Sequence, residues 1–218
     1  YIQILDEKSQ RLRQLTADLV EASKISSGNV KLDMQVIDLV ELVYQTSGEF
    51  NEKFEQKELT IVTKLPKTAV LIRADGRQLY RVIENLYNNV AKYALEKTRV
   101  YVDISYVEEK VVFSIKNVSE HSLARENSNA GDLTERFIRG DSSRTTEGSG
   151  LGLSIAKSLT VLMGGVFDIK VDGDLFKASI TFPQYVDENS SNPKMEEPAS
   201  EDDYEIEELE PEERTEEE

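Results

Sequence analysis

The sequence predicts an α+β protein in which a two-layer α/β sandwich follows one long helix. Four segments repeat apolar residues every three or four positions, which is typical of amphipathic helices. Six short segments of six to nine residues read as strands, bounded by turn residues. Because the strands cluster instead of alternating regularly with helices, we expect a mixed sheet with helices on one face.

The first predicted element is an amphipathic helix from Ile4 to about Ile25. Its apolar residues lie mostly three or four positions apart and are Leu5, Leu12, Leu15, Leu19, Ala22 and Ile25. No adjacent segment offers a hairpin partner, so the one-sided stripe indicates a truncated bundle or a dimer. Residues 26–29, SSGN, end the helix with turn chemistry.

A short apolar stretch at Lys31–Ile37 then precedes a helical pattern at Leu39–Phe54. Strands are expected at 59–65 and 69–74. Asp75 occupies the position of a helix N-cap, directly before the periodic segment LYRVIENLYNNVAKYAL.

Two alternating segments, RVYVDISYV and KVVFSIKNV, predict a β-hairpin around EEK. The polar stretch Ser119–Glu147 that follows is long for a loop in a compact domain, and such loops are usually lids or disordered. A helix is expected from Leu151 to about Met163. The last two strands, GVFDIKV and LFKASITF, are joined by DGD.

Acidic residues concentrate near the C-terminal end. The formal net charge is −16, and residues 185–218 contribute −14 of it from 16 acidic and two basic residues. This segment is poor in large apolar residues and contains proline, so we expect a disordered, solubilising tail. The near-neutral body gives no reason to expect nucleic-acid binding. These boundaries divide the chain into residues 1–27, 28–184 and 185–218.

Several classes of protein are excluded by composition. The chain has no cysteine, so it has neither a disulfide framework nor a thiolate metal site. It contains no run of eighteen apolar residues, and its charged start lacks the apolar core of a signal peptide. We therefore expect this chain to be soluble and cytoplasmic.

Polar residues on the helix after Asp75 could bind a nucleotide. Asn85, Asn89 and Lys92 share one helical face. Two amides and an ammonium suit Mg²⁺ and phosphate oxygens, and the adjacent Tyr93 could pack on a base. Taken alone, the stripe reads more simply as a solvated helix face.

The segment TEGSGLGLSIAK adds a second phosphate-binding signal. Gly148, Gly150 and Gly152 lead into the start of a helix, where free N–H groups and the helix dipole attract anions. The segment lacks the Lys-Ser/Thr pair of a P-loop. Two such elements separated by a long loop carry more weight than either alone.

Together these segments resemble the conserved boxes of sensor histidine kinases. ENLYNNVAKYA resembles the asparagine box, ERFIRGDSSR the phenylalanine box, and EGSGLGLSIAKSL with a later MGG the second glycine box. Their order and spacing agree over roughly Val30–Pro183. The N-terminal helix resembles the second helix of the dimerisation and phosphoacceptor hairpin. The resemblance implies the Bergerat ATP-binding fold, shared with gyrase, MutL-type repair proteins and heat-shock chaperones.

The resemblance also implies residue roles. Asn89 would coordinate Mg²⁺, while Asn85 and Lys92 would contact phosphate; these three form the implied catalytic set. Phe137 and Arg139 would lie in a mobile ATP lid. The implied nucleotide-binding residues are Tyr93, Asn117, Ser119, Phe137, Arg139, Gly148, Ser149, Gly150, Leu151, Gly152 and Leu153.

Two departures from the family pattern are visible. The DxGxG box reads NVSEH, so Asn117 stands at the Asp position, and Ser119 and His121 replace glycines. An Asn oxygen can still accept a hydrogen bond from the adenine amino group, without the charge of a carboxylate. His121, the only histidine, lies beyond the hairpin. We therefore expect the sequence to begin after the phosphoacceptor histidine of a longer protein.

The function implied is the ATP-binding catalytic region of a membrane-anchored sensor histidine kinase. It would use ATP and Mg²⁺, dimerise through the N-terminal helix, work on the cytoplasmic side of the membrane and serve a response-regulator receiver domain. Two alternatives stay open. One is a nucleotide-sensing module that is degenerate at Asn117 and has no kinase activity. The other is a serine-phosphorylating anti-sigma factor of the same fold, although those proteins are short and need no long helix.

Overall fold

The computed structural model describes residues 9, 12–13, 16–20, 23–25, 30–120, 151–186 and 204–209. Every described position among the first 25 residues is helical, as predicted. The other elements are β1 (Met34–Asp38), α2 (Leu39–Glu55), β2 (Thr60–Pro66), β3 (Leu71–Asp75), α3 (Gly76–Tyr93), β4 (Arg99–Val107), β5 (Lys110–Val118), α5 (Gly152–Leu162), β6 (Val166–Asp172), β7 (Leu175–Pro183) and β8 (Tyr204–Leu209).

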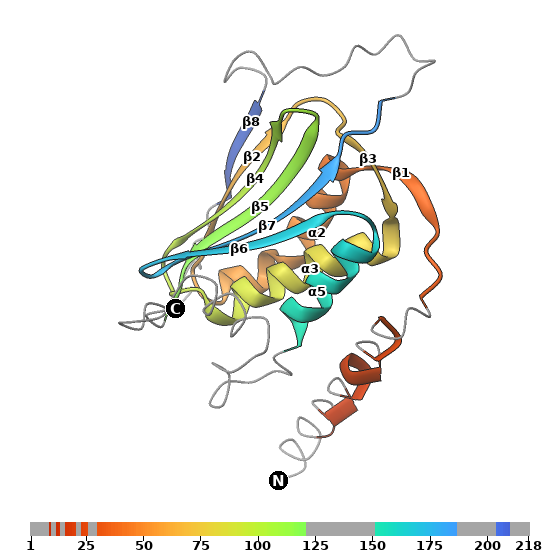
Figure 1. Cartoon of the computed structure of the whole chain (residues 1–218). Helices are drawn as coiled ribbons and strands as arrows, with labels where there is room; N and C mark the ends of the chain where they lie inside the picture. Colours follow the sequence, from red (N-terminus) through yellow and green to blue (C-terminus); the bar gives the residue numbers. More distant parts are fainter. Residues whose placement is uncertain are drawn as a thin grey trace, which may run out of the picture.

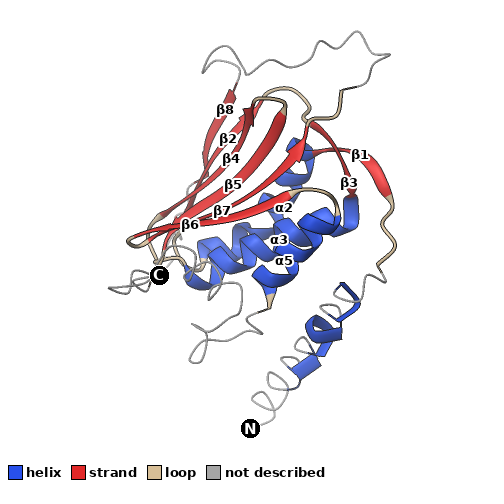
Figure 2. Cartoon of the chain, in the orientation of Figure 1, coloured by secondary structure: helices blue, strands red, loops and turns tan. Residues whose placement is uncertain are grey.

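A six-stranded sheet forms one layer of the protein, with strand order β6-β7-β5-β4-β2-β8. Strands β2 and β4 run parallel, and the other neighbouring pairs run antiparallel. Helices α2, α3 and α5 lie together against one face of this sheet (Figures 1 and 2). The predicted two-layer sandwich with a mixed sheet is therefore confirmed.

The alternation of side chains decides which face of the sheet the helices cover. In β4, Val100, Val102, Ile104 and Tyr106 are buried, while the residues between them are exposed or half-buried. Successive side chains of a strand point to opposite faces, so these four share the helix-covered face. Phe113 of β5 joins the same core.

Helix α3 packs on this core through an apolar face with helical spacing. Its buried residues are Leu79, Val82, Ile83, Leu86, Tyr87 and Val90. The Tyr87 ring lies 5.3 Å from the ring of Phe50 and stacks on that of Phe54, centroid to centroid. Its hydroxyl oxygen lies 2.7 Å from Ser47 Oγ, which satisfies both buried polar groups. Helices α2 and α3 are therefore joined by an aromatic cluster.

Strands β1 and β3 form a separate two-stranded sheet. The predicted strand at 69–74 is β3, and the apolar stretch at 31–37 supplies its antiparallel partner. The Tyr185 N–H donates to the Leu71 carbonyl at 2.8 Å, so β3 also meets the chain leaving β7. This small sheet holds the start of α3 in place.

Asp75 is the N-cap of α3, as predicted. Its Oδ1 accepts from the N–H groups of Arg77 and Gln78, both at 3.1 Å, and its Oδ2 accepts from the Asp33 N–H at 2.9 Å. Burial alone would raise the pKa of Asp75, but these backbone donors outweigh it, so the pKa is lowered. One carboxylate thus joins the segment before β1 to the start of α3.

The prediction of a disordered tail over residues 185–218 is wrong for Tyr204–Leu209. These residues form β8, which pairs antiparallel with the edge strand β2. Glu205 Oε2 accepts from the Tyr44 hydroxyl at 3.0 Å, and Glu208 Oε1 accepts from Arg99 Nε at 2.8 Å. The prediction was based on the acidic composition of the whole segment, whereas the short stretch YEIEEL pairs with β2 and its carboxylates accept hydrogen bonds from the sheet and from α2.

We predict that Asp75→Ala lowers the free energy of unfolding by about 2–3 kcal/mol at neutral pH, because an N-cap and hydrogen bonds to a charged acceptor are lost. Urea denaturation followed by circular dichroism measures this change. Asp33→Ala is the matched control, since it keeps the backbone donor and removes only an exposed contact with Gln35.

The effect should depend on pH with a defined sign. A lowered pKa adds stability above the pKa of the unfolded state, about 3.9, and this stability is lost as the pH falls through the folded value. The difference between wild type and Asp75→Ala should therefore shrink under acid conditions. A constant difference between neutral and strongly acid pH would show that Asp75 does not act as a carboxylate.

Candidate functional site

The candidate site begins on the face of α3 opposite to its core residues. Asn85, Asn89 and Lys92 are all half-buried on this face, as their spacing predicts. Neighbouring Asn88 differs, because it is exposed and accepts from Lys53 Nζ of α2 at 3.2 Å. The helix therefore presents two amides and one ammonium on a single stripe.

Helix α5 meets this stripe at its first residue. A Cβ atom added to Gly152 would lie 2.9 Å from Asn85 Oδ1, so only glycine permits this approach without displacing the amide. The Asn85 side chain is held by its own Nδ2, which donates to the Arg81 carbonyl at 2.9 Å. The asparagine stripe and the end of the glycine-rich segment are thus in contact.

The start of α5 directs backbone rather than side chains toward the site. Its N-cap residue, Leu151, makes no side-chain cap hydrogen bond. Leu153 is only 5% exposed and belongs to the core. A helix start carries partial positive charge on its first N–H groups, which suits an anion. The contribution predicted for Leu153 can therefore come only from its backbone.

The other end of α3 meets the end of β5. The Glu120 N–H donates to the Tyr93 carbonyl at 2.9 Å, and Ala94 forms an antiparallel bridge with Ser119. Lys92 Nζ lies 4.6 Å from the centroid of the Tyr93 ring. These contacts bring together residues far apart in sequence, as a nucleotide site at this junction requires.

Asn117 lies at this end of β5 on the helix-covered face and is 2% exposed. Its Nδ2 donates to the Val118 carbonyl at 2.9 Å, whereas its Oδ1 is buried with no partner among the described residues. A buried acceptor left without a donor costs about 1–3 kcal/mol. The arrangement fits a ligand that brings an N–H group to this oxygen.

Part of the predicted set lies outside the described residues. This is the case for Phe137, Arg139, Gly148, Ser149 and Gly150, and also for His121. The structure describes Asn85, Asn89, Lys92, Tyr93, Asn117, Ser119, Leu151, Gly152 and Leu153. In the structure, Asn85 lies beside Gly152, and Ala94, which follows Tyr93, pairs with Ser119.

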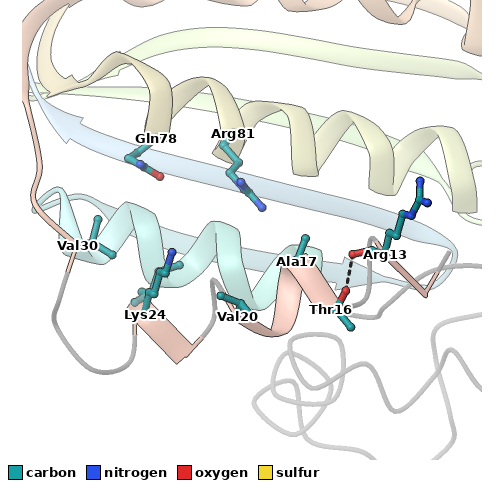
Figure 3. A pocket seen from close by; sticks show the side chains of 9 residues that line it. Arg13, Thr16, Ala17, Val20, Lys24, Val30, Gln78 and Arg81 are labelled. Carbon is teal, nitrogen blue, oxygen red and sulfur yellow. Dashed lines mark hydrogen bonds between the residues drawn. The ribbon is translucent and has the colours of Figure 1, made fainter. Parts of the chain in front are cut away.

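Arg81 is a residue that sequence reasoning missed. Its carbonyl holds Asn85, and its Nη2 lies 4.0 Å from Asp18 Oδ1 of the N-terminal helical segment. Its position one turn before Asn85 was the available signal. Figure 3 shows Gln78 and Arg81 of α3 facing this segment across a pocket of about 690 Å³. The pocket is lined by Arg13, Thr16, Ala17, Val20, Lys24, Ile25, Val30, Gln78 and Arg81.

Residues 74–194 match the family described as "Histidine kinase-, DNA gyrase B-, and HSP90-like ATPase". The alginate biosynthesis sensor protein KinB of Pseudomonas aeruginosa is 29% identical over 164 residues, covering 75% of this chain and 27% of KinB. The sensor histidine kinase WalK of Bacillus subtilis is 24% identical over 186 residues, covering 84% and 30%. The chain thus spans less than a third of either relative.

Solved structures show the same fold. The Acinetobacter baumannii histidine kinase AdeS superposes with a TM-score of 0.67 at 18% identity, covering 85% of this chain and 84% of that one. Full-length ShkA in complex with AMPPNP gives 0.71 at 21% identity, covering 86% and 39%. Among the described residues, no helix combines the length and apolar character needed to cross a membrane.

We predict that Gly152→Ala displaces the Asn85 side chain and breaks its bond to Arg81, at a cost of about 0.5–1.5 kcal/mol in unfolding free energy. The Asn85 side-chain amide resonance in a ¹H–¹⁵N spectrum should shift. Gly48→Ala in α2 is the matched control, because nothing lies within 4 Å of its added Cβ. It should raise stability by about 0.5–1 kcal/mol. An unmoved Asn85 resonance in Gly152→Ala would contradict the close approach.

Proposed function

This chain belongs to the family of histidine kinase-, DNA gyrase B- and HSP90-like ATPases, and we propose that it is the ATP-binding catalytic region of a sensor histidine kinase. The observation that carries the proposal is the contact of the α3 amide stripe with the start of α5 at Gly152. Asn85 thereby meets the first N–H groups of α5, and Asn89 and Lys92 follow it along the same face of α3.

The phosphate end of ATP fits this contact. Asn89 would ligate Mg²⁺, which takes oxygen ligands and is usually held by a few protein groups together with phosphates and water. Asn85 and Lys92 would contact phosphate, beside the backbone N–H groups of Leu151, Gly152 and Leu153. Mg-ATP would supply the transferable phosphoryl group, while these residues orient it and neutralise its charge.

The adenine end fits Asn117. Because Nδ2 is engaged by the Val118 carbonyl, Oδ1 is the atom that has no partner among the described residues, and it can only accept. Adenine presents an amino group that donates, whereas guanine presents a carbonyl at the same position. Tyr93 and Ser119 lie at this end of the site, and the ring of Tyr93 could pack against the base.

The N-terminal helical segment fits a helix of a dimerisation hairpin. Leu12 and Leu19 are 62% and 63% exposed, which leaves an apolar stripe for a second helix. In the complete protein, a histidine on the upstream helix would accept the phosphoryl group and pass it to a response-regulator receiver domain. Such a kinase would be anchored in the membrane and act on its cytoplasmic side.

We predict that Asn89→Ala weakens Mg-ATP binding at least tenfold, which is about 1.4 kcal/mol, because the metal loses its protein ligand. Calorimetric titration with Mg-ATP, and with ATP plus a chelator, measures this loss. The matched control is Asn88→Ala, one residue away but turned toward Lys53. Equal affinity for Mg-ATP in wild type and Asn89→Ala would refute the assignment.

The same pair of variants tests phosphoryl transfer. A hairpin carrying the acceptor histidine is incubated with the chain, Mg²⁺ and γ-labelled ATP. Label should reach histidine with wild type and Asn88→Ala, but not with Asn89→Ala. ATP binding without any labelled histidine would favour the nucleotide-sensing alternative.

We predict that Asn117 distinguishes ATP from nucleotides without an amino group at the same position. Wild type should bind ATP about two- to tenfold more tightly than the triphosphate of unsubstituted purine riboside, since one neutral hydrogen bond contributes about 0.5–1.5 kcal/mol. In Asn117→Ala this preference should disappear. The four affinities form a double-mutant cycle, so general loosening of the site cancels.

GTP supplies a further comparison in the same titrations. Its carbonyl would face Asn117 Oδ1 and repel it, so GTP should bind wild type more weakly than either of the other nucleotides. If the amino group made no difference to wild type, Asn117 would be only a strand-end residue, and the site would hold ATP by its phosphates.

A further inference from the structure

The face of the sheet opposite the helices carries three lysines side by side. Lys116 of β5 is directly opposite Lys177 of β7, which is directly opposite Lys170 of β6. Figure 2 shows helices α2, α3 and α5 on the other face of these strands. We call these residues the lysine row. Like charges directly opposite one another destabilise a sheet, so the row has a cost that a bound anion would remove.

No member of the lysine row forms an ion pair with another described residue. Four described carboxylates share this face: Asp103 of β4, Asp168 and Asp172, which flank Lys170 on its own strand, and Glu208 of β8. Burial raises the pKa of Asp103, and Lys64 with two lysines of the row lowers it without reversing the shift. None of these carboxylates forms an ion pair with the lysine row among the described residues.

The same cross-strand line continues to the acidic strand β8. Tyr101 is opposite Lys116, whose Nζ lies 4.7 Å from its ring centroid. Val62 is opposite Tyr101, and Glu208 of β8 is opposite Val62. Glu208 also accepts from Arg99 at 2.8 Å. The acidic segment thus already binds a basic residue at one end of the line.

Strand β8 ends where it can deliver more acidic residues to the row. Leu209 is opposite Ile61, so the chain leaves β8 at the end of the sheet where the lysine row lies. Residues 210–218, EPEERTEEE, contain six glutamates and one arginine. Neighbouring strands lie about 4.8 Å apart, so β5 is about 14 Å and β6 about 24 Å from β8. Nine extended residues span about 30 Å, which is enough to reach all three lysines.

We propose that the glutamate-rich segment 210–218 folds back across the open face of the sheet and binds the lysine row. The open face is then a docking surface for an acidic segment, occupied by the chain itself. Each exposed ion pair is weak and screened by salt, so the contact depends on ionic strength.

The absence of cysteine permits a direct test on the full chain. A nitroxide is attached to Thr215→Cys, a position that carries no charge. Amide signals of the lysine row are then compared in the oxidised and reduced states of the label by ¹H–¹⁵N spectroscopy. We expect these signals in β5, β7 and β6 to broaden at about 0.01 M salt and to recover at about 1 M, where screening is strong.

Two triple variants distinguish binding to the lysine row from a general attraction between the acidic segment and positive charge. The triple variant Lys116→Gln, Lys170→Gln, Lys177→Gln should lose the broadening, whereas Lys31→Gln, Lys110→Gln, Lys157→Gln removes the same charge from exposed lysines away from the row and should keep it. Broadening confined to β8 and β2, or equal in both triple variants, would overturn the proposal. Spin-labelled chain mixed with isotope-enriched chain that carries no spin label tests for a second copy, and broadening in that mixture as strong as in the spin-labelled, enriched chain would also overturn the proposal.

Discussion

Helix α3 has to satisfy two environments at once, and the site depends on this constraint. Its core face, centred on Tyr87, is fully buried against α2 and the sheet. Its other face carries Asn85, Asn89 and Lys92, and a period of 3.6 residues keeps the two sets apart. Rotation of α3 about its axis would bury the amides of Asn85 and Asn89 and at the same time expose the ring of Tyr87. The core therefore fixes the direction of the amides, and Gly152 can approach Asn85 only because that direction is fixed.

Most of the fold was predictable because its signals are local. The alternation in β4 and β5, the N-cap at Asp75 and the period of α3 each lie within one short stretch, and all three were confirmed. The pairing of β3 with β1 was not visible, since it joins segments about forty residues apart. Strand β8 was missed because average composition outweighed six residues whose donors, Tyr44 and Arg99, lie in distant elements.

The candidate site, like the fold, could be predicted from the sequence only in part. The shared face of Asn85, Asn89 and Lys92 and the helix start at Gly152 could be predicted, because both follow from short motifs and helix geometry. The role of the Arg81 carbonyl was missed because residue type says nothing about it, and only its position one turn before Asn85 points to it. Which side-chain atom of Asn117 has no partner among the described residues could be learned only from the structure. The hydrogen bond from Nδ2 to the Val118 carbonyl shows that Oδ1 is the atom without a hydrogen-bond partner among the described residues.

Three features of this fold are unfavourable in isolation, and each has an identifiable complement. Among the described residues, a buried Asn117 oxygen has no donor, the start of α5 has no side-chain cap, and three lysines lie opposite one another on an open face. A native domain has only about 5–15 kcal/mol of stability, so such costs are kept where something offsets them. In the proposed function, an adenine amino group would complement the first and phosphate the second. In our proposal the glutamates that follow β8 would complement the third. In that proposal, the acidic residues 210–218 and the lysine row of the near-neutral body neutralise one another.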